Sequence, residues 1–259
     1  MKLLIVCPIP VEYKTCRQVL SLREISPLNN CRMGRKESGN LEVLAIESGP
    51  TKARTAAAVA SAIMHHRPDL IIDSGSCGGL EPGITMGQII IAESCYEYDI
   101  TGSGLPRRVI PEMILKSALS FMPTEDGDLL QREAVEAGRE EGYRVRVSSQ
   151  ACGEFLVADY STKQLLYSLF HASGCNWETA GVFVPVLRSK KPPLSFRIVT
   201  DLGDSNALSD FRSNVKIRSK ELYSYLNALI ETGWFNHFCE VWQQLGKEVL
   251  ERLPASVKP

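Results

Sequence analysis

The sequence predicts a single α/β domain whose central sheet is mixed and mostly parallel, with flanking helices. Short apolar runs typical of buried strands, at residues 2–7, 70–72, 88–92 and 195–199, alternate with stretches whose apolar residues have helical spacing. The chain has 259 residues, of which 44% are hydrophobic and 23% charged, so it can bury one large core and lacks the bias of a disordered protein. We expect residues 1–259 to form one domain.

The first part of the chain predicts a strand, followed by a second strand and a helix. Residues 2–7 form an apolar strand that runs into the loop 8–12, and this loop ends on an acidic residue, Glu12. Residues 41–46 alternate between apolar and polar side chains, as a strand does. The alanine-rich residues 51–66 have apolar side chains at helical spacing, so we expect a helix there.

Two further buried strands are predicted on either side of a glycine-rich segment. The apolar residues 70–72 run into segment 74–79, which contains three glycines. Glycines at this density indicate a tight turn that lets a ligand approach the backbone. Residues 88–92 form the next buried strand.

The second half of the chain predicts helices before the last strand. Residues 111–142 have a polar, helical pattern with a break at Pro123, and their charges indicate a solvated face. Asp159 or Ser161 can cap the next helix, and another helix is expected to start near Asn176. Because strands and helices alternate, we expect helices on both faces of the sheet.

The charge balance limits the class of partner. Lys and Arg number 29 against 30 Asp and Glu, which leaves a net charge of −1. No overall basic field therefore exists to hold a nucleic acid or an anionic membrane surface. No apolar run approaches the roughly 20 residues that a membrane span needs. We expect a small-molecule partner, no nucleic acid and no membrane.

The cysteines and histidines predict a reduced protein without a metal. Eight cysteines occur without any Cys-x-x-Cys pair, which fits reduced thiols in a cytoplasmic protein. His65 and His66 are adjacent, so on a helix they point about 100° apart and cannot bind one ion together. We expect no metal and no organic cofactor.

Three acidic residues lie at the ends of predicted elements. Glu12 follows the first strand, Glu178 stands at the start of a helix, and Asp201 follows the last strand. Taken singly, each acid is commonly a helix cap or a solvated loop end. In sheets of this kind, however, ligands bind at the carboxyl ends of the strands, where Glu12, Ser76 and Asp201 are all expected. We therefore predict that these side chains share one pocket.

Six short motifs resemble those of one protein family, in order and spacing, along roughly residues 1–230. They are the start of the chain through Glu12, Ser48-Gly49-Pro50-Thr51-Lys52-Ala53, Asp73-Ser74-Gly75-Ser76-Cys77-Gly78-Gly79, Phe155-Leu156-Val157-Ala158-Asp159, Trp177-Glu178-Thr179-Ala180-Gly181 and Thr200-Asp201-Leu202-Gly203-Asp204. On these motifs the chain resembles the nucleoside phosphorylase/nucleosidase superfamily, and is most similar to the 5′-methylthioadenosine/S-adenosylhomocysteine nucleosidases. The resemblance implies a nucleoside phosphorylase-like fold and a nucleoside substrate.

The same resemblance implies a role for each acid in breaking the glycosidic bond to a purine. Asp201 would donate a proton to the five-membered ring of the base, which requires burial to raise its pKa from about 3.9. Glu178 would stay ionised and hold the ribose hydroxyls, which favours positive charge at the anomeric carbon. Glu12 would act as general base on the attacking water, with Ser76 as a polar neighbour.

The resemblance also implies contacts for the base and the sugar. The purine is expected against backbone groups of Leu156 and Val157, because residues 155–159 resemble the base-binding strand of the family; a plain core strand is the alternative. Asn176 and Trp177 stand where the nucleosidases usually carry Glu-Met. Trp177 therefore either reshapes the pocket for the sugar or the 5′ group, or packs in the core.

Two parts of the chain have no counterpart in the resemblance. Residues 102–152 match none of its motifs, and residues 234–259 run past the usual end of the family. Either part can alter subunit contacts or cover the site. Family members commonly form homodimers in which one subunit completes the pocket of the other, so a homodimer is expected by analogy.

Together these expectations predict a nucleosidase that hydrolyses the N-glycosidic bond of a 5′-modified adenine nucleoside and releases adenine. A protonated Asp201 can also accept a hydrogen bond from a 6-amino group, which favours adenine over a 6-oxopurine. The loop 8–12 offers an acid and no arginine, which favours water over phosphate as nucleophile. The alternatives are a purine nucleoside phosphorylase that uses inorganic phosphate and a nucleoside-binding protein without catalysis. A pure binder needs no general base, so the three acids disfavour the second.

Overall fold

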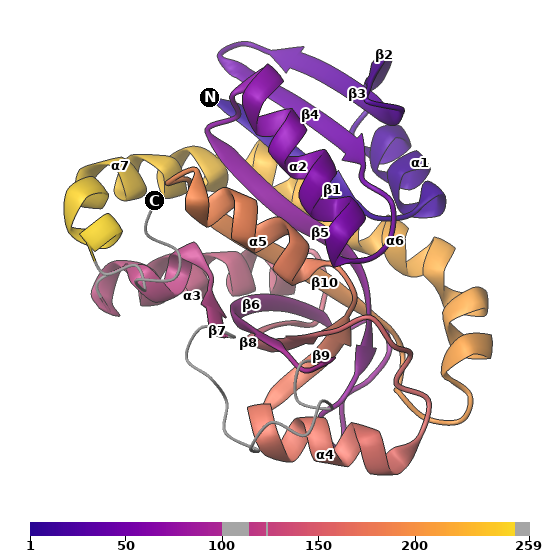
Figure 1. The fold of residues 1–259 in the computed structure, drawn as a ribbon. Coiled ribbons are helices and arrows are strands. Elements are labelled where there is room, and N and C mark those ends of the chain that lie inside the picture. Colours follow the sequence, from indigo (N-terminus) through magenta and orange to yellow (C-terminus); the bar gives the residue numbers. More distant parts are fainter. Residues whose placement is uncertain (100–113, 123, 252–259) are drawn as a thin grey trace.

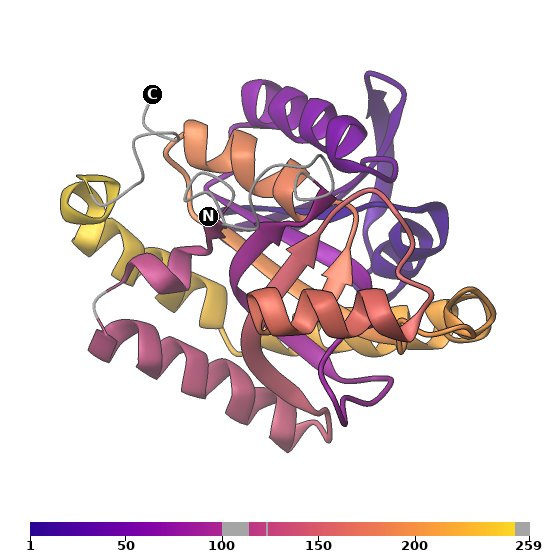
Figure 2. The same ribbon diagram turned by 60° about the horizontal axis from the view of Figure 1, so that its bottom comes forward.

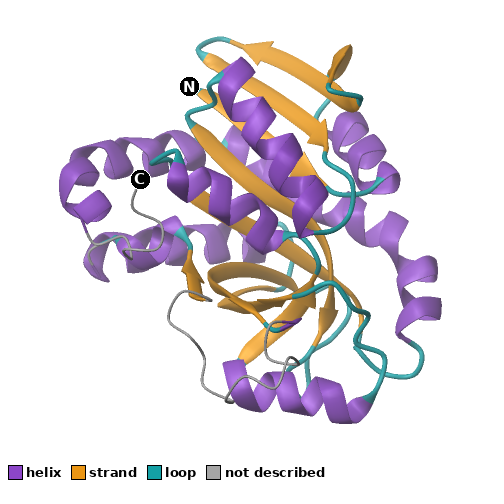
Figure 3. Ribbon diagram, in the orientation of Figure 1, coloured by secondary structure: helices purple, strands orange, loops and turns teal. Residues whose placement is uncertain are grey.

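The strands form one sheet, and helices cover its two faces (Figure 1, Figure 3). The computed structural model describes residues 1–99, 114–122 and 124–251. The strands are β1 (Lys2–Cys7), β2 (Arg23–Leu28), β3 (Cys31–Ser38), β4 (Leu41–Glu47), β5 (Leu70–Gly79), β6 (Ile89–Glu97), β7 (Ile114–Lys116), β8 (Val145–Cys152), β9 (Ala172–Asn176) and β10 (Pro193–Asp201). The helices are α1 (Pro10–Val19), α2 (Lys52–His66), α3 (Thr124–Glu140), α4 (Tyr160–Phe170), α5 (Thr179–Arg188), α6 (Ala207–Glu231) and α7 (Trp234–Glu251), and a short 3-10 helix spans Ala118–Phe121.

The sheet is mixed, and part of it closes into a ring. Its strand order is β10-β6-β8-β9-β5-β1-β4-β3-β2, with β7 paired to β6. Because β5 pairs with both β9 and β10, the strands β5, β10, β6, β8 and β9 close on themselves. Outside this ring, β1 pairs in parallel with the first part of β5, β4 pairs in parallel with β1, and β3 and β2 end the sheet as antiparallel strands. The predicted α/β class with a mixed sheet is confirmed.

Paired helices account for the burial of the central strands. α2 and α5 pack together on one face of the sheet, and α1 and α6 pack together on the other (Figure 1). Every residue of β10 is buried, as is β1 from Leu3 onward, which is the pattern of strands covered on both faces. α4 packs against β8 and β9 (Figure 2). Of the helices in the described ranges, none is apolar over enough of its length to span a bilayer.

Three segments near the predicted site differ from the sequence prediction. Residues 74–79 belong to β5 and do not form a turn. The loop expected at 8–12 is cut short because α1 begins at Pro10, whose fixed φ suits the first helical position, so Glu12 lies in the first helical turn. Residues 155–159 form a loop between β8 and α4, not a strand.

The middle of the chain contains more structure than the predicted helix. In the span 111–142, a strand (β7) and the 3-10 helix precede α3; residues 111–113 and Pro123, the predicted break, lie outside the described residues. The strands β2, β3, β8 and β9 were not predicted. The prediction of an N-cap at Asp159 is confirmed, since its Oδ1 accepts a hydrogen bond from the Thr162 N–H at 2.8 Å. The helix expected near Asn176 is α5, which follows the end of β9.

The C-terminal helix α7 completes the core on the side away from α2. Its aromatic residues Trp234, Phe235, Phe238 and Trp242 are buried and belong to the main hydrophobic cluster. Phe196 of β10 makes edge contacts with Trp234 and Phe235, at ring-centroid distances of 6.2 and 6.1 Å. The described part of α7 therefore packs against β10 through these aromatic side chains.

Candidate functional site

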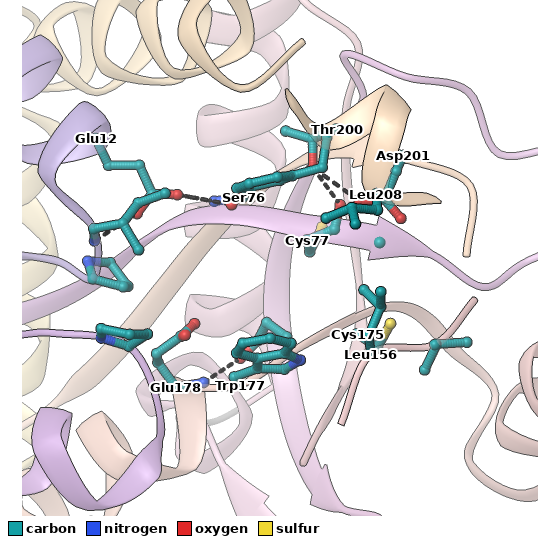
Figure 4. A pocket seen from close by; sticks show the side chains of 17 residues that line it. Glu12, Ser76, Cys77, Leu156, Cys175, Trp177, Glu178, Thr200, Asp201 and Leu208 are labelled. Carbon is teal, nitrogen blue, oxygen red and sulfur yellow. Dashed lines mark hydrogen bonds between the residues drawn. The ribbon is translucent and has the colours of Figure 1, made fainter. Parts of the chain in front are cut away.

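A cavity of about 330 Å³ lies where the carboxyl ends of β1, β5 and β10 meet the starts of α1 and α5 (Figure 4). This is the edge of the sheet at which α/β proteins bind ligands. The cavity is lined by all seven residues singled out from the sequence: Glu12, Ser76, Leu156, Val157, Trp177, Glu178 and Asp201. The remaining lining residues are Pro8, Ile9, Pro50, Cys77, Gly78, Cys175, Asn176, Thr200, Leu208 and Phe211.

Glu12 is held by the start of its own helix and by β5. Its Oε2 accepts a hydrogen bond from the N–H of Ile9, the N-cap residue of α1, at 3.2 Å. Its Oε1 accepts from the N–H and the hydroxyl of Ser76, at 2.7 and 2.8 Å. Glu12 is 1% exposed, and this burial raises its pKa to about 7, although Arg197 acts in the opposite direction. The carboxyl can therefore gain or lose a proton near neutral pH.

Asp201 ends β10 on another side of the cavity from Glu12 (Figure 4). Its Oδ2 accepts a hydrogen bond from the Thr200 hydroxyl, and its Oδ1 accepts one from the Gly203 N–H, both at 3.1 Å. Burial raises the pKa of Asp201, while these two hydrogen bonds lower it. The side chain is fixed and is disposed to hold a proton longer than a free aspartic acid does.

Glu178 stands at the N-cap position of α5, and its neighbour Asn176 supplies the cap. The Asn176 Oδ1 accepts from the N–H groups of Glu178 and Thr179, at 3.0 and 2.9 Å. The Glu178 side chain is thereby free to reach the cavity, where its Oε2 pairs with Arg197 Nη1 at 3.1 Å. Its Oε1 accepts from the Thr51 N–H at 3.4 Å. Burial raises the pKa of Glu178, and Arg197 lowers it.

The sequence analysis missed a buried ion pair behind these carboxylates. Arg197 of β10 and Asp73 of β5 are 1% and 0% exposed, and they form a bidentate pair with N–O distances of 2.9 and 2.5 Å. A signal was present in the sequence, because a charged residue inside a strand as apolar as 195–199 is rare without a buried partner. Nothing in the local pattern indicated which acid that partner was.

One wall of the cavity is formed by Leu156 and Val157, from the loop after β8, and by Trp177, which follows β9. Leu156 is 45% exposed and Trp177 37% exposed, whereas Val157 is buried. The loop is held through the carbonyl of Phe155, which accepts from the Trp177 indole N–H at 3.2 Å and from the Tyr98 hydroxyl at 2.8 Å. These two hydrogen bonds from side chains anchor the loop at Phe155. Trp177 lines the cavity and does not pack in the core.

The groups that surround the cavity suit proton transfer and polar recognition. Within the described ranges, no cluster of three His, Cys, Asp or Glu side chains is arranged to bind a metal ion. The three carboxyl groups are the titratable groups with oxygen atoms at the cavity, and they come from α1, α5 and β10. The cavity can therefore offer a ligand a proton donor, a proton acceptor and an anionic hydrogen-bond acceptor at separate points.

Comparison with known protein families identifies the family of this chain. Residues 2–231 match the family model described as the phosphorylase superfamily. The chain belongs to the phosphorylase superfamily. The superfamily resemblance predicted from the six motifs is therefore confirmed, and it covers every element from β1 to the end of α6.

This phosphorylase-superfamily chain is similar to several named proteins over most of its length. The 5′-methylthioadenosine/S-adenosylhomocysteine nucleosidase of Buchnera aphidicola subsp. Schizaphis graminum is 25% identical over 235 residues, which is 89% of this chain and 97% of that protein. The corresponding protein of Haemophilus influenzae is 22% identical over 193 residues, which is 73% of this chain and 81% of that protein.

Solved structures show the same fold. The futalosine hydrolase of Helicobacter pylori has a TM-score of 0.78 and 20% identity, and the alignment covers 90% of this chain and 98% of that one. The 5′-methylthioadenosine/S-adenosylhomocysteine nucleosidase of Neisseria meningitidis, solved with methylthio-immucillin-A, has a TM-score of 0.76 and 18% identity, with coverage of 89% and 99%.

In this phosphorylase-superfamily chain, glycines let β5 pass close to two acids. A Cβ atom at Gly75 would lie 2.9 Å from Glu12 Oε1 and 3.1 Å from Arg197 Nη1, and a Cβ at Gly78 would lie 2.9 Å from Asp201 Oδ1. Gly75 also has a φ of +146°, which other residues rarely adopt. The predicted turn at this segment is a strand, and the groups that approach its glycines in the structure are the side chains of Glu12, Arg197 and Asp201.

Gly75→Ala is expected to destabilise the protein by about 1–3 kcal/mol more than Gly83→Ala. Both glycines have a positive φ, but a Cβ at Gly83 would meet nothing within 4 Å. The difference between the variants measures the collision with Glu12 and Arg197 together with the greater backbone strain of alanine at a φ of +146° than at +82°. Urea unfolding of the two variants measures the difference, and equal losses of stability would show that the packing around Gly75 can yield.

Proposed function

We propose that this protein is a nucleosidase that hydrolyses the N-glycosidic bond of a 5′-modified adenine nucleoside and releases adenine. The observation that carries the proposal is the meeting of three buried carboxyl groups, from Glu12, Glu178 and Asp201, at one cavity. Proteins named as 5′-methylthioadenosine/S-adenosylhomocysteine nucleosidases, similar over 89% and 73% of the chain, support the choice of substrate class. The cytoplasmic location and the homodimer that the resemblance implies belong to the same proposal.

Asp201 is proposed as the acid that protonates the leaving purine. Departure of an adenine anion is difficult, and a proton delivered to its five-membered ring makes the base a better leaving group. Burial raises the pKa of Asp201, which favours the protonated form that an acid needs. The wall beside it, formed by Leu156 and Val157, is apolar and offers backbone groups to the base, in keeping with their expected role.

Glu178 is proposed to bind the ribose and to stabilise its positive charge. Loss of the base leaves an oxocarbenium-like sugar, which a nearby carboxylate stabilises electrostatically. The ion pair with Arg197 at 3.1 Å favours the ionised form of Glu178. In Figure 4, Glu178 and Glu12 lie together on the side of the cavity away from Asp201, which suits a ligand with its sugar near the two glutamates and its base near the aspartate.

Glu12 is proposed as the general base that activates water, with Ser76 holding its carboxylate. A base works best when its pKa lies near the working pH, and the pKa of Glu12 is raised to about 7. The spacing along β5 is consistent with this division of roles. A Cβ at Gly75 would meet Glu12 and one at Gly78 would meet Asp201, so the two acids lie against different points of this strand.

Water is the proposed nucleophile because the described residues that line the cavity offer no cation to bind phosphate. Among the described residues that line it, none is a lysine or an arginine. Arg197 is close by, but its guanidinium is 1% exposed and is occupied by Asp73, Glu178 and the Ser76 carbonyl. A phosphorylase would need such a group free to bind its anionic substrate.

The proposal predicts adenine release that does not require phosphate. Purified protein is incubated with 5′-methylthioadenosine, S-adenosylhomocysteine, adenosine and inosine, with and without inorganic phosphate, and the free base is followed by chromatography. We expect equal rates of adenine release in both buffers and a free sugar as second product. Release only with phosphate would make the protein a phosphorylase, and no release from any nucleoside would favour a binding protein.

A further inference from the structure

Asp73 is fully buried behind the cavity and is not among its lining residues. Its Oδ2 accepts hydrogen bonds from the hydroxyls of Thr179 and Ser195, both at 2.7 Å, and from Arg197 Nε at 2.9 Å. Its Oδ1 accepts from Arg197 Nη2 at 2.5 Å. Four hydrogen bonds, from one residue of α5 and two residues of β10, therefore converge on one carboxylate.

The remaining nitrogen of the same guanidinium, Nη1, binds groups at the cavity. Arg197 Nη1 donates to Glu178 Oε2 at 3.1 Å and to the Ser76 carbonyl at 3.2 Å. Because a guanidinium is rigid and planar, fixing its Nε and Nη2 also fixes the position of Nη1. The hydrogen bonds between Asp73 and Arg197 therefore help to fix the position of the Glu178 carboxylate. They also help to fix the segment of β5 that binds Glu12.

Asp73 also balances the charge next to the proposed base. The groups that face Glu12 are Arg197 of β10, Glu178 at the start of α5, Ser76 of β5 and, from α6, Tyr223. Arg197 stabilises the ionised form of Glu12, and Glu178 opposes it. With Asp73 bound in bidentate fashion, much of the charge of Arg197 is already compensated before Glu12 and Glu178 are considered.

We propose that Asp73 is a positioning residue for the reaction: it fixes the plane of Arg197 and compensates its charge, so that Glu178 is held for the sugar and Glu12 stays able to exchange a proton. This inference rests on the proposed nucleosidase function. It assigns no contact between Asp73 and the substrate. Its effect passes through Arg197, and it should be visible both in substrate affinity and in the pH dependence of the rate.

The test is the pH profile of kcat/KM for Asp73→Asn, measured on the full chain by adenine release. The variant leaves the charge of Arg197 without its main partner, so Arg197 stabilises the Glu12 carboxylate more strongly. We expect the acidic limb of the profile to move about one pH unit lower than in the wild type. A folded Asp73→Asn variant with the wild-type limb would overturn the proposal.

The matched comparison is the double variant Thr179→Val/Ser195→Ala, which removes two donors to Asp73 and keeps every charge. We expect its acidic limb to stay at the wild-type pH, while KM rises at least about threefold because Arg197 and Glu178 are held less firmly. If Asp73→Asn does not fold, this variant decides, since an unchanged KM would overturn the positioning role. If the acidic limb of the double variant shifts as far as that of Asp73→Asn, lost charge compensation is not the cause of the shift, because the double variant keeps every charge.

The wild type in the same experiment separates the two proposals. Wild-type protein that releases no base from any nucleoside would refute the nucleosidase function, and this inference with it. Wild-type turnover together with an unshifted Asp73→Asn profile would refute the role of Asp73 alone.

Discussion

Asp201→Asn is expected to lower kcat by about 10²- to 10⁴-fold, while nucleoside binding is retained. The amide has the shape of the carboxyl group and can still accept a hydrogen bond from the Thr200 hydroxyl or the Gly203 N–H. It cannot transfer a proton to the departing purine. Single-turnover rates of adenine release give the loss of the chemical step, and equilibrium binding of 5′-methylthioadenosine gives the affinity.

A matched control is Asp210→Asn, which removes a nearby negative charge from the first turn of α6 without touching the cavity. We expect wild-type turnover from it. If Asp201→Asn also turned over at the wild-type rate, the proton for the base would have to come from elsewhere. The Asn variant should also lack one pH-dependent component of stability. Burial raises the pKa of Asp201 above 3.8, so as pH rises above that value the unfolded state releases its proton first and the wild type loses stability.

Glu12→Gln is expected to reduce kcat/KM by about 10²- to 10⁴-fold and to abolish the acidic limb of the pH profile. With a pKa of about 7, Glu12 is mostly protonated below neutral pH and cannot accept a proton from water there. The wild-type rate should therefore rise with pH through about 7, as Glu12 loses its proton. Initial rates at pH 5 to 9 check the limb.

The stability of the same variant offers an independent check of the pKa of Glu12. The folded carboxyl binds its proton more tightly than the model value of 4.5 implies for an unfolded chain. As pH rises from about 4.5 to about 7, the unfolded state loses this proton first, so the wild type loses stability over that window. Glu12→Gln should lack this component in urea unfolding at pH 5 and 8. An acidic limb that persists in Glu12→Gln would assign the base to another group.

The sequence predicts best those parts of the fold that depend on local pattern. β1, β4, α2 and the end of β10 are read from apolar periodicity, because each buries a face or a whole strand. The N-cap at Asp159 follows from residue type alone. The placement of Glu12, Ser76 and Asp201 at one cavity was reached by combining these strands with the rule that ligands bind at their carboxyl ends, and the family resemblance added Glu178.

The features that could not be predicted from the sequence depend on contacts between residues far apart in the chain. β9 (ASGCN) is short and rich in small residues, so only its pairing with β5 and β8 makes it a strand. The glycines of β5 suggested a turn, yet they are needed because the side chains of Glu12 and Asp201 lie against that strand. The bidentate pair of Asp73 and Arg197 joins residues 124 positions apart, a distance at which local patterns carry no information.

The helix α7 has a consequence for where this protein can be divided. The match to the superfamily ends at residue 231, but the hydrophobic core does not, since Trp234, Phe235 and Phe238 pack into the same cluster as Phe196. Phe196 lies on the strand that carries both Arg197 and Asp201. The end of the family match is therefore not the end of the hydrophobic core. A chain shortened to residue 231 would leave the strand that bears the proposed acid without one of its supports.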